Sequence, residues 1–432
     1  MINNSLIYKI SLTLILIIAV SSFCNAQDLT YARSVVNHLA STDFYGRGYV
    51  NNGSKIAADY ISKQFDSLNL QSFGKKHYQP FKISVNTFPG NMVLTINDQE
   101  LTVGKDFIID PGSPSVQGDF EVEILLVADI LDYQKLSETL RRSSKKFVII
   151  PPFKIKSYTK EEQEKIRGII NFLKYQPENP AAGLIQLTDE KLTWGGSTRQ
   201  NTKPAFTVMA TEELNDIKKV SVKVEAKFIE NYKTQNVIGY VEGERNDSLI
   251  VLTAHYDHLG MMGEGVVFPG ANDNSSGIAM LLNLAKYFQQ NPPQFTTVFM
   301  ALGAEELGLL GAKYFVENPL FELSKIKFLI NFDLAGTGDD GIQVVNGKVY
   351  QDKFDQLVRI NEEQQLLKQV KIRGEACNSD HCMFHNEGVP CFYIYTLGGI
   401  QAYHDIDDKA ETLPLTEFED YYRLITAFIE TL

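Results

Sequence analysis

The fold of this chain is decided by one stretch, which reads SLIVLTAHYDHLG at residues 248–260, PGANDNSSGIAMLLNLAKYF at 269–288 and TTVFMALGAEELG at 296–308. The first and third segments contain apolar, β-branched runs of strand length. The second segment begins with a cluster of helix-capping residues and continues as an apolar helical pattern. A strand, a helix and another strand in this order predict a sheet covered by helices.

The same alternation continues through residues 231–432, which we assign to one domain. The strands expected there are 236–241, 249–254, 297–301, 328–333 and 390–395, and the expected helices are 275–289, 307–316, 353–368 and 416–430. Strands that alternate with helices build a mostly parallel central sheet with helices on both faces, so the predicted fold class is α/β.

The part of the chain before this domain has two segments with different secondary-structure patterns. Residues 27–78 read as two helices joined by a loop rich in Gly and Asn, and we assign them to the same domain. Residues 79–230 contain short β-rich runs and one polar helical segment at 160–173. They contain no cluster of His, Cys or acidic residues with the spacing of metal ligands. We expect this block to be an inserted β-rich domain that shapes access to a site; the alternative is a purely structural elaboration.

Residues 1–26 have the pattern of a signal peptide. A basic residue precedes an apolar run at residues 10–20, and Ala26 supplies the small residue before a cleavage site. The run is too short for a stable membrane span. Bulky Phe23 argues against lipidation of Cys24. The sequence therefore predicts export to the periplasm or the extracellular space.

Net charge and cysteine content limit which binding partners and which kinds of cysteine site this protein can have. The formal charge of −12 argues against nucleic acid and anionic membranes as partners, because both attract basic surfaces. Three cysteines remain after Cys24, and an odd number argues against a disulfide scaffold. Cys377 and Cys382 either pair or stay as free thiols, and Cys391 lies in an expected strand. Their spacing does not match a cysteine zinc site.

Imidazole and carboxylate groups follow successive strands. His255, Glu306 and His404 each come after an expected strand, Asp333 ends one, and Asp273 lies at a helix start. Each residue alone has an ordinary explanation, such as a helix cap or a surface side chain. Because the carboxyl ends of parallel strands meet at one edge of a sheet, we expect these five side chains to converge. Such ligands suit zinc and also accept manganese or cobalt, and Asp273 could bridge two ions with its two oxygens.

Two further acids have expected roles beside such a pair of ions. Glu305 precedes Glu306 in extended backbone, where neighbours point to opposite sides, so it can face an attacking water as general base and then protonate a leaving amine. Asp257 can hold the second ring nitrogen of His255. Two ions roughly 3.5–4 Å apart would share a hydroxide and polarise a carbonyl oxygen.

Other candidates have weaker patterns. We expect Ser379, Asp380 and His381 to contact a substrate, with structural hydrogen bonding as the equal alternative. His258 is expected to line the loop beside His255 or to support a ligand. The sequence contains no Gly-x-Ser-x-Gly elbow after a strand, no P-loop and no dinucleotide-binding glycine fingerprint.

Six ordered motifs resemble the M28 family of zinc metallopeptidases, the aminopeptidase and glutamate-carboxypeptidase-like group. They are TAHYDHLG, PGANDNSSG, ALGAEELGLLGAKYF, NFDLAGTG, NSDHCMFHNEGVPCFYIYT and AYHDIDD. The resemblance covers residues 28–70 and 235–432. Less closely, SKKFVIIPP, PAAGLIQLTDEK and KPAFTVMATEEL in the middle block resemble a protease-associated domain.

The resemblance implies a zinc-exopeptidase fold of the phosphorylase/hydrolase-like type and an exopeptidase activity, most simply that of an aminopeptidase acting on peptides. It implies two zinc ions per chain, held by His255, Asp273, Glu306, Asp333 and His404, with Asp273 as the bridge. Glu305 would be the base and Asp257 the partner of His255, and a cis peptide would follow Asp273. Three alternatives are a single-zinc glutaminyl cyclase, a carboxypeptidase of the same fold and a non-catalytic binding protein.

Overall fold

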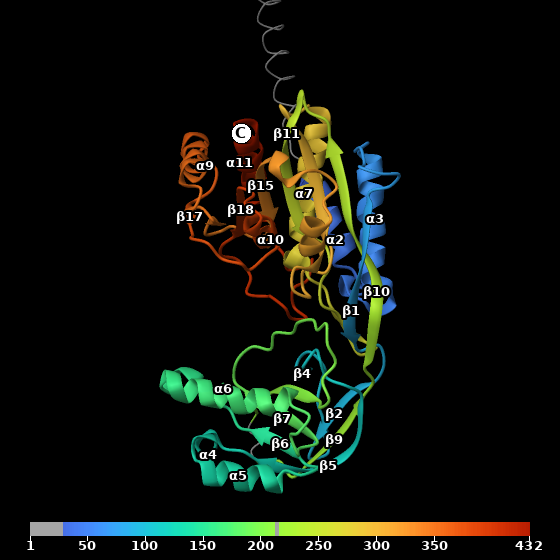
Figure 1. Cartoon of the computed structure of the whole chain (residues 1–432), viewed down its shortest axis with the longest axis vertical. Coiled ribbons are helices and arrows are strands. Elements are labelled where there is room, and N and C mark those ends of the chain that lie inside the picture. Colours follow the sequence, from blue (N-terminus) through green and yellow to red (C-terminus); the bar gives the residue numbers. More distant parts are fainter. Residues whose placement is uncertain (1–28, 212–215) are drawn as a thin grey trace, which may run out of the picture.

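The computed structural model describes residues 29–211 and 216–432 in two lobes (Figure 1). The expected signal peptide, residues 1–26, and Cys24 lie outside the described residues. The larger lobe contains residues 29–87 and everything from residue 227 onward, and the smaller lobe is built from the middle of the chain. In the described part of the chain, no helix has the length and apolar character needed to span a bilayer.

An eight-stranded mixed sheet forms the centre of the larger lobe, in the order β1-β10-β14-β11-β15-β18-β16-β17. Its strands are β1 (Tyr78–Thr87), β10 (Lys227–Val241), β11 (Arg245–His255), β14 (Phe295–Leu302), β15 (Ile326–Phe332), β16 (Ile342–Val345), β17 (Val370–Ile372) and β18 (Cys391–Thr396). The central strands β14, β11, β15 and β18 are parallel, as predicted, whereas β10 joins β14 and β16 joins β18 in antiparallel pairs. The α/β prediction is confirmed, with antiparallel strands added toward both edges.

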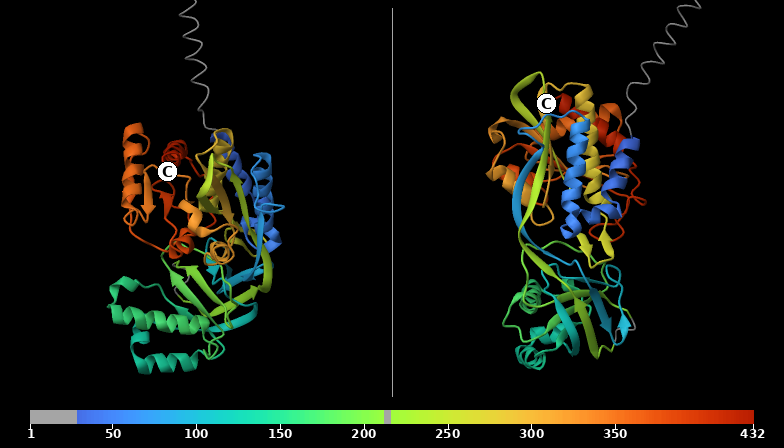
Figure 2. Two further views of the ribbon diagram at one scale, coloured as in Figure 1. Left: turned by 45° about the horizontal axis from the view of Figure 1, so that its top comes forward. Right: turned by 90° about the vertical axis from the view of Figure 1, so that its right-hand side faces the viewer.

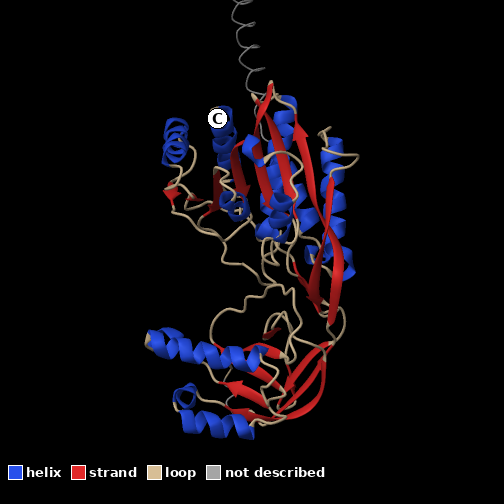
Figure 3. Ribbon diagram, viewed as in Figure 1, coloured by secondary structure: helices blue, strands red, loops and turns tan. Residues whose placement is uncertain are grey.

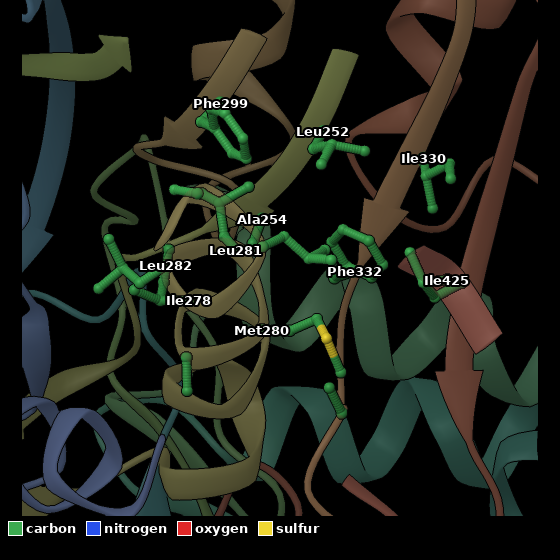
Figure 4. Close-up of a cluster of buried hydrophobic side chains, with 14 of the residues drawn as sticks. Leu252, Ala254, Ile278, Met280, Leu281, Leu282, Phe299, Ile330, Phe332 and Ile425 are labelled. Atoms are coloured by element: carbon green, nitrogen blue, oxygen red, sulfur yellow. The ribbon is translucent and has the colours of Figure 1, made fainter. Parts of the chain in front are cut away.

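Helices cover both faces of this sheet, as Figure 3 shows. One face carries α2 (Leu29–Leu39), α3 (Gly53–Ser67), α7 (Gly277–Gln290), α9 (Gln351–Gln364) and α11 (Phe418–Glu430), and the other carries α8 (Leu310–Glu317) and α10 (His381–Asn386). Strand side chains alternate between the faces, so Leu252 packs with the first group and Val251 with the second. Burial on both faces explains the unbroken apolar runs of the central strands. Figure 4 shows Leu252, Ala254 and Phe299 of the strands in one cluster with Ile278 and Leu281 of α7.

The smaller lobe has its own eight-stranded sheet, in the order β3-β2-β9-β5-β6-β7-β8-β4. The strands are β2 (Met92–Ile96), β3 (Gln99–Glu100), β4 (Phe107–Ile109), β5 (Val116–Ile124), β6 (Phe147–Ile150), β7 (Gly183–Thr188), β8 (Ala205–Met209) and β9 (Lys219–Val224). Helix α6 (Lys160–Tyr175) matches the predicted polar helix, but α4 (Val127–Leu131) and α5 (Tyr133–Arg142) were missed. α4 has only five residues, and α5 is so polar that it buries only Leu136 and Thr139, so neither contains an apolar run that would indicate a helix.

A long ribbon and a common core join the two lobes. β1, which we expected to begin the insertion, pairs with β10 along its whole length at the edge of the main sheet. Figure 2 shows both strands running from the larger lobe into the smaller one. Beside them, Phe88 and Trp194 pack in one hydrophobic cluster with Met262 and Phe268 of the hairpin formed by β12 (Gly260–Met262) and β13 (Val266–Phe268). The inserted lobe is therefore packed onto the larger one.

Candidate metal centre

The five predicted ligands lie together at the carboxyl edge of the central strands. His255 is the last residue of β11, Asp333 follows β15, and Glu306 follows β14. His404 lies in the loop after β18, and Asp273 lies in the short helical segment η5 (Ala271–Ser276) that precedes α7. The side chains come from five separate segments, and the parallel order of the strands brings them to one place.

The distances divide these side chains into two groups that share Asp273. His255 Nε2 lies 3.3 Å from Asp273 Oδ1 and 3.5 Å from Asp333 Oδ1. His404 Nε2 lies 3.1 Å from Asp273 Oδ2 and 3.3 Å from Glu306 Oε2. Each oxygen of Asp273 thus faces a different histidine, which is the arrangement that a carboxylate bridging two cations requires.

Burial and charge show that this donor set suits a cation. The side chains of Asp273 and Glu306 are only 4% and 6% exposed. Burial, followed by the negative charge of Asp273, raises the pKa of Glu306 to about 7. Burial also raises the pKa of Glu305 well above its usual range. Carboxylates packed this closely away from water repel one another, and a bound cation would relieve that repulsion. Mixed imidazole and carboxylate donors suit zinc.

Asp257 has a different partner from the one predicted. His255 Nδ1 lies 3.2 Å from the backbone carbonyl oxygen of Asp257, not from its carboxylate. The carboxylate instead accepts hydrogen bonds from the backbone N–H of Glu305 (3.0 Å) and Glu306 (3.4 Å), and from the hydroxyl of Tyr49 (3.2 Å). Asp257 therefore holds the turn that carries the predicted base and one ligand.

His258 supports Glu306 from behind. Its Nδ1 lies 2.7 Å from Glu306 Oε1, the oxygen that does not face His404. Burial lowers the pKa of His258 well below its usual value. A neutral imidazole with its proton on Nδ1 would donate one hydrogen bond to the Glu306 carboxylate. This matches the supporting role that we considered for His258.

For Ser379, Asp380 and His381, the structure favours the alternative of structural hydrogen bonding over substrate contact. All three are completely buried, and none lines the cavity over the metal centre. Ser379 donates to Asp333 Oδ2 at 3.0 Å and accepts from Asn331, so it orients a predicted ligand from below. The cavity is instead lined by the neighbouring Cys377 and Asn378, with Cys377 held in a disulfide to Cys382. Cys391 is a buried free thiol.

Two residues that sequence reasoning missed hold the backbone around Asp273. Arg47, at the end of the short helical segment η1 (Thr42–Arg47), is completely buried. Its five N–H groups donate, at 2.6–3.0 Å, to the carbonyl oxygens of Leu39, Tyr256, Pro269, Gly270 and Asp273. On the other side, the carboxylate of Asp408 accepts from the backbone N–H of Asn272 (2.8 Å) and Asp273 (3.0 Å). The peptide bond after Asp273 is cis, as the resemblance implied.

The glycines beside Arg47 were the signal that could have identified it. A Cβ at Gly46 would lie 2.5 Å from the carbonyl oxygen of Gly260, and one at Gly48 would lie 2.4 Å from the Cα of Gly260. Only glycine allows such a close approach of two backbones. Because the backbone at both glycines packs against the backbone of Gly260, the arginine between them is buried.

A cavity of about 520 Å³ opens over the metal centre, a size that suits a small ligand. Beyond the predicted ligands and Glu305, its lining includes Leu309, Tyr395, Tyr403, Asn378 and Arg373. The Arg373 guanidinium donates to the hydroxyl of Tyr395 at 3.1 Å and forms no salt bridge within the described residues. Paired metal donors at a sheet edge, beneath such a cavity, form a candidate site for metal-assisted chemistry on a small ligand.

Comparison with known proteins relates the larger lobe to a peptidase family. Residues 236–429 match the model of peptidase family M28. Aminopeptidase YwaD of Bacillus subtilis (strain 168) is 29% identical over 232 residues, which cover 50% of this chain and 48% of the relative. Leucine aminopeptidase 2 of Trichophyton rubrum is 31% identical over 173 residues, which cover 40% of this chain and 32% of the relative. The chain thus spans about half or less of the length of these relatives.

Solved structures extend the likeness of the fold over both lobes. The zinc aminopeptidase BSAP from Bacillus subtilis superposes with a TM-score of 0.70 at 21% identity, covering 94% of this chain and 95% of that one. The peptidase M28 precursor from Shewanella amazonensis SB2B superposes with a TM-score of 0.65 at 17% identity, covering 94% and 97% of the two chains. At this identity the likeness concerns the fold alone.

Proposed function

We propose that this chain is an exported di-zinc aminopeptidase that removes N-terminal residues from peptides. The observation that carries the proposal is the pair of donor groups that share Asp273, with Glu305 left over beside them. His255 and Asp333 would hold one zinc ion and Glu306 and His404 the other, with Asp273 held in common. Bound zinc would polarise the scissile carbonyl group and lower the pKa of a water molecule.

Glu305 is the residue to which we assign the proton transfers. It lines the cavity, and its backbone N–H is fixed by Asp257, so its carboxylate is held next to the donor groups without being one of the five. Burial raises its pKa, which increases its affinity for the proton that the attacking water must lose. The same proton then passes to the leaving amine as the peptide bond breaks, which returns Glu305 to its carboxylate form.

The proposal includes two features of the rest of the chain. Export is supported by the signal-peptide pattern of residues 1–26 and agrees with the disulfide between Cys377 and Cys382, since such bonds persist in oxidising compartments. The smaller lobe would correspond to a protease-associated domain, as three of its sequence segments suggest.

A carboxypeptidase is the second candidate, and Arg373 is the observation that favours it. An arginine in the wall of the cavity could bind the C-terminal carboxylate of a peptide through two hydrogen bonds. Lys371, which is exposed on the neighbouring strand β17 and does not line the cavity, provides a matched control. If carboxylate recognition matters, Arg373→Gln will raise KM for substrates with a free C-terminus, whereas Lys371→Gln will not.

One set of four substrates tests the proposal. A single tripeptide sequence is prepared free, N-acetylated, C-amidated and blocked at both ends, and zinc is measured on the same protein sample. An aminopeptidase cleaves the free and amidated peptides only, and a carboxypeptidase cleaves the free and acetylated peptides only. Two zinc ions per chain support the proposal. Cyclisation of an N-terminal glutamine with one zinc ion would show a glutaminyl cyclase instead, and a protein that converts none of these substrates would contradict any catalytic function.

A further inference from the structure

His404 is held differently from the other predicted ligands. It lies in the loop after β18 with a φ of +52°, in the left-handed region that a residue other than glycine seldom adopts. Such a conformation persists only where surrounding contacts enforce it. The backbone of His404 therefore needs a support from outside its own loop.

That support comes from the inserted lobe. The backbone N–H of Trp194 donates to the carbonyl oxygen of His404 at 2.9 Å, and His404 Nδ1 lies 2.9 Å from the carbonyl oxygen of Trp194. Because a carbonyl oxygen can only accept, Nδ1 must carry the proton of this hydrogen bond. The other ring nitrogen, Nε2, faces Asp273 and Glu306. Trp194 thus sets both the orientation and the proton position of His404, as partners of metal-binding histidines do.

The segment that carries Trp194 is anchored on both lobes. The indole N–H donates to the carbonyl oxygen of Ile109 at 2.8 Å, and the ring packs against Phe268 at a centroid distance of 4.8 Å. Lys191 forms an ion pair with Asp405 and donates to the carbonyl oxygen of Gln401 at 2.6 Å. Figure 1 shows where the chain of the smaller lobe meets the loop after β18, between the two lobes.

The other half of the centre has its supports within the larger lobe. His255 is paired with the carbonyl oxygen of Asp257, and Asp333 with the hydroxyl of Ser379. Arg47 and Asp408, which hold the backbone of Asp273, also belong to the larger lobe. Among the described residues, the inserted lobe contacts only the second group, that of His404 and Glu306. There Gly196 also lies against Leu307, the residue after Glu306.

We infer that Lys191 and Trp194 of the inserted lobe are positioning residues for one of the two metal positions, the one formed by His404 and Glu306. The inference rests on the proposed di-zinc function. It gives the insertion a part in assembling the site, through a contact that sets the geometry of a ligand without touching substrate. Loss of this contact would weaken one metal position and leave the position of His255 and Asp333 intact.

The test is a zinc titration in competition with a chelator, on the full mature chain. Lys191→Met removes the ion pair at a side chain that is 44% exposed, so the variant is expected to fold. Trp194→Ala removes the indole anchor, and Trp194→Phe keeps a ring in the same cluster as the conservative variant. Lys146→Met is the matched control, because it breaks a 3.2 Å ion pair with Glu121 on the surface of the smaller lobe.

We expect Lys191→Met and Trp194→Ala to weaken one of the two zinc equivalents at least tenfold and to leave the other within twofold of wild type. Trp194→Phe should recover most of the affinity, and Lys146→Met should match wild type. Equal weakening of both equivalents, or no weakening of either, would overturn the inference. Peptide hydrolysis by the wild-type chain tests the proposed function separately, since the inference is judged from the change in zinc affinity.

Discussion

Replacement of Arg47 by lysine tests whether the backbone around Asp273 depends on a single buried side chain. The substitution keeps the positive charge, so it isolates the hydrogen-bonding geometry. All five N–H groups of Arg47 are used, each on a backbone carbonyl oxygen, and the side chain has no exposed surface. No water can therefore replace a lost donor without a rearrangement of the loops.

The magnitude follows from counting donors. A lysine ammonium has three N–H groups, so at least two of the five carbonyl oxygens lose their partner. A buried polar group left without a partner costs about 1–3 kcal/mol, so we expect Arg47→Lys to lower the free energy of unfolding by about 2–6 kcal/mol. Zinc affinity should fall as well, because three of these carbonyls belong to Pro269, Gly270 and Asp273.

The assay is urea unfolding of the metal-free protein in excess chelator, because bound zinc would add its own stabilisation. Arg33→Lys is the matched control: Arg33 is half-buried and donates to three carbonyl oxygens, those of Ala410, Leu413 and Pro414, which an ammonium can serve. We expect a loss of less than about 1 kcal/mol for that variant. An equally small loss for Arg47→Lys, with unchanged zinc affinity, would refute the argument.

Two other substitutions test the site. Glu305→Gln should lower kcat by about 10²–10⁴-fold, because it removes the proton acceptor, while zinc content stays at the wild-type value; near-normal turnover with the metals bound would rule out the assigned role. Asp380 is a completely buried carboxyl without a hydrogen-bond partner among the described residues, and burial raises its pKa from 3.8 to about 8. The native state therefore keeps a proton that the unfolded chain releases, so the metal-free protein should lose stability as pH rises from about 4 to about 8, by up to about 1.4 kcal/mol per unit. Asp380→Asn should reduce that loss in thermal unfolding measured across this range, to which buried Glu305 and Glu306 also contribute, and an unchanged pH profile would show that Asp380 does not contribute.

Local sequence patterns predicted where the strands of the larger lobe end. Apolar runs that end in His255 and Asp333, and the helix that follows Asp273, are properties of short segments, and the parallel order of the strands then brings their ends together. The same approach missed α4, which is very short, and α5, which has few apolar residues. It also placed β1 in the insertion, although β1 pairs at the edge of the main sheet.

The hydrogen-bond partners of individual side chains could not be predicted from local sequence patterns. Proximity in sequence suggested that the Asp257 carboxylate pairs with His255, but in the structure it holds the backbone of Glu305 and Glu306. Ser379 and Asp380 were expected near substrate and are buried beneath the centre. In each case two or more partners were chemically acceptable, and only the packing of distant segments selects one.

The chain's hydrophobic periodicity and its polar strand ends thus specify the α/β fold and the segments that meet at the carboxyl edge, because both depend on neighbours within a few residues. Two supports of the centre, the contacts of Arg47 with Asp273 and of Trp194 with His404, join residues more than 200 positions apart. Such contacts produce no hydrophobic periodicity in the sequence, because they form where irregular loops pack against one another. Their identity depends on how the two lobes and the chain's two ends pack together.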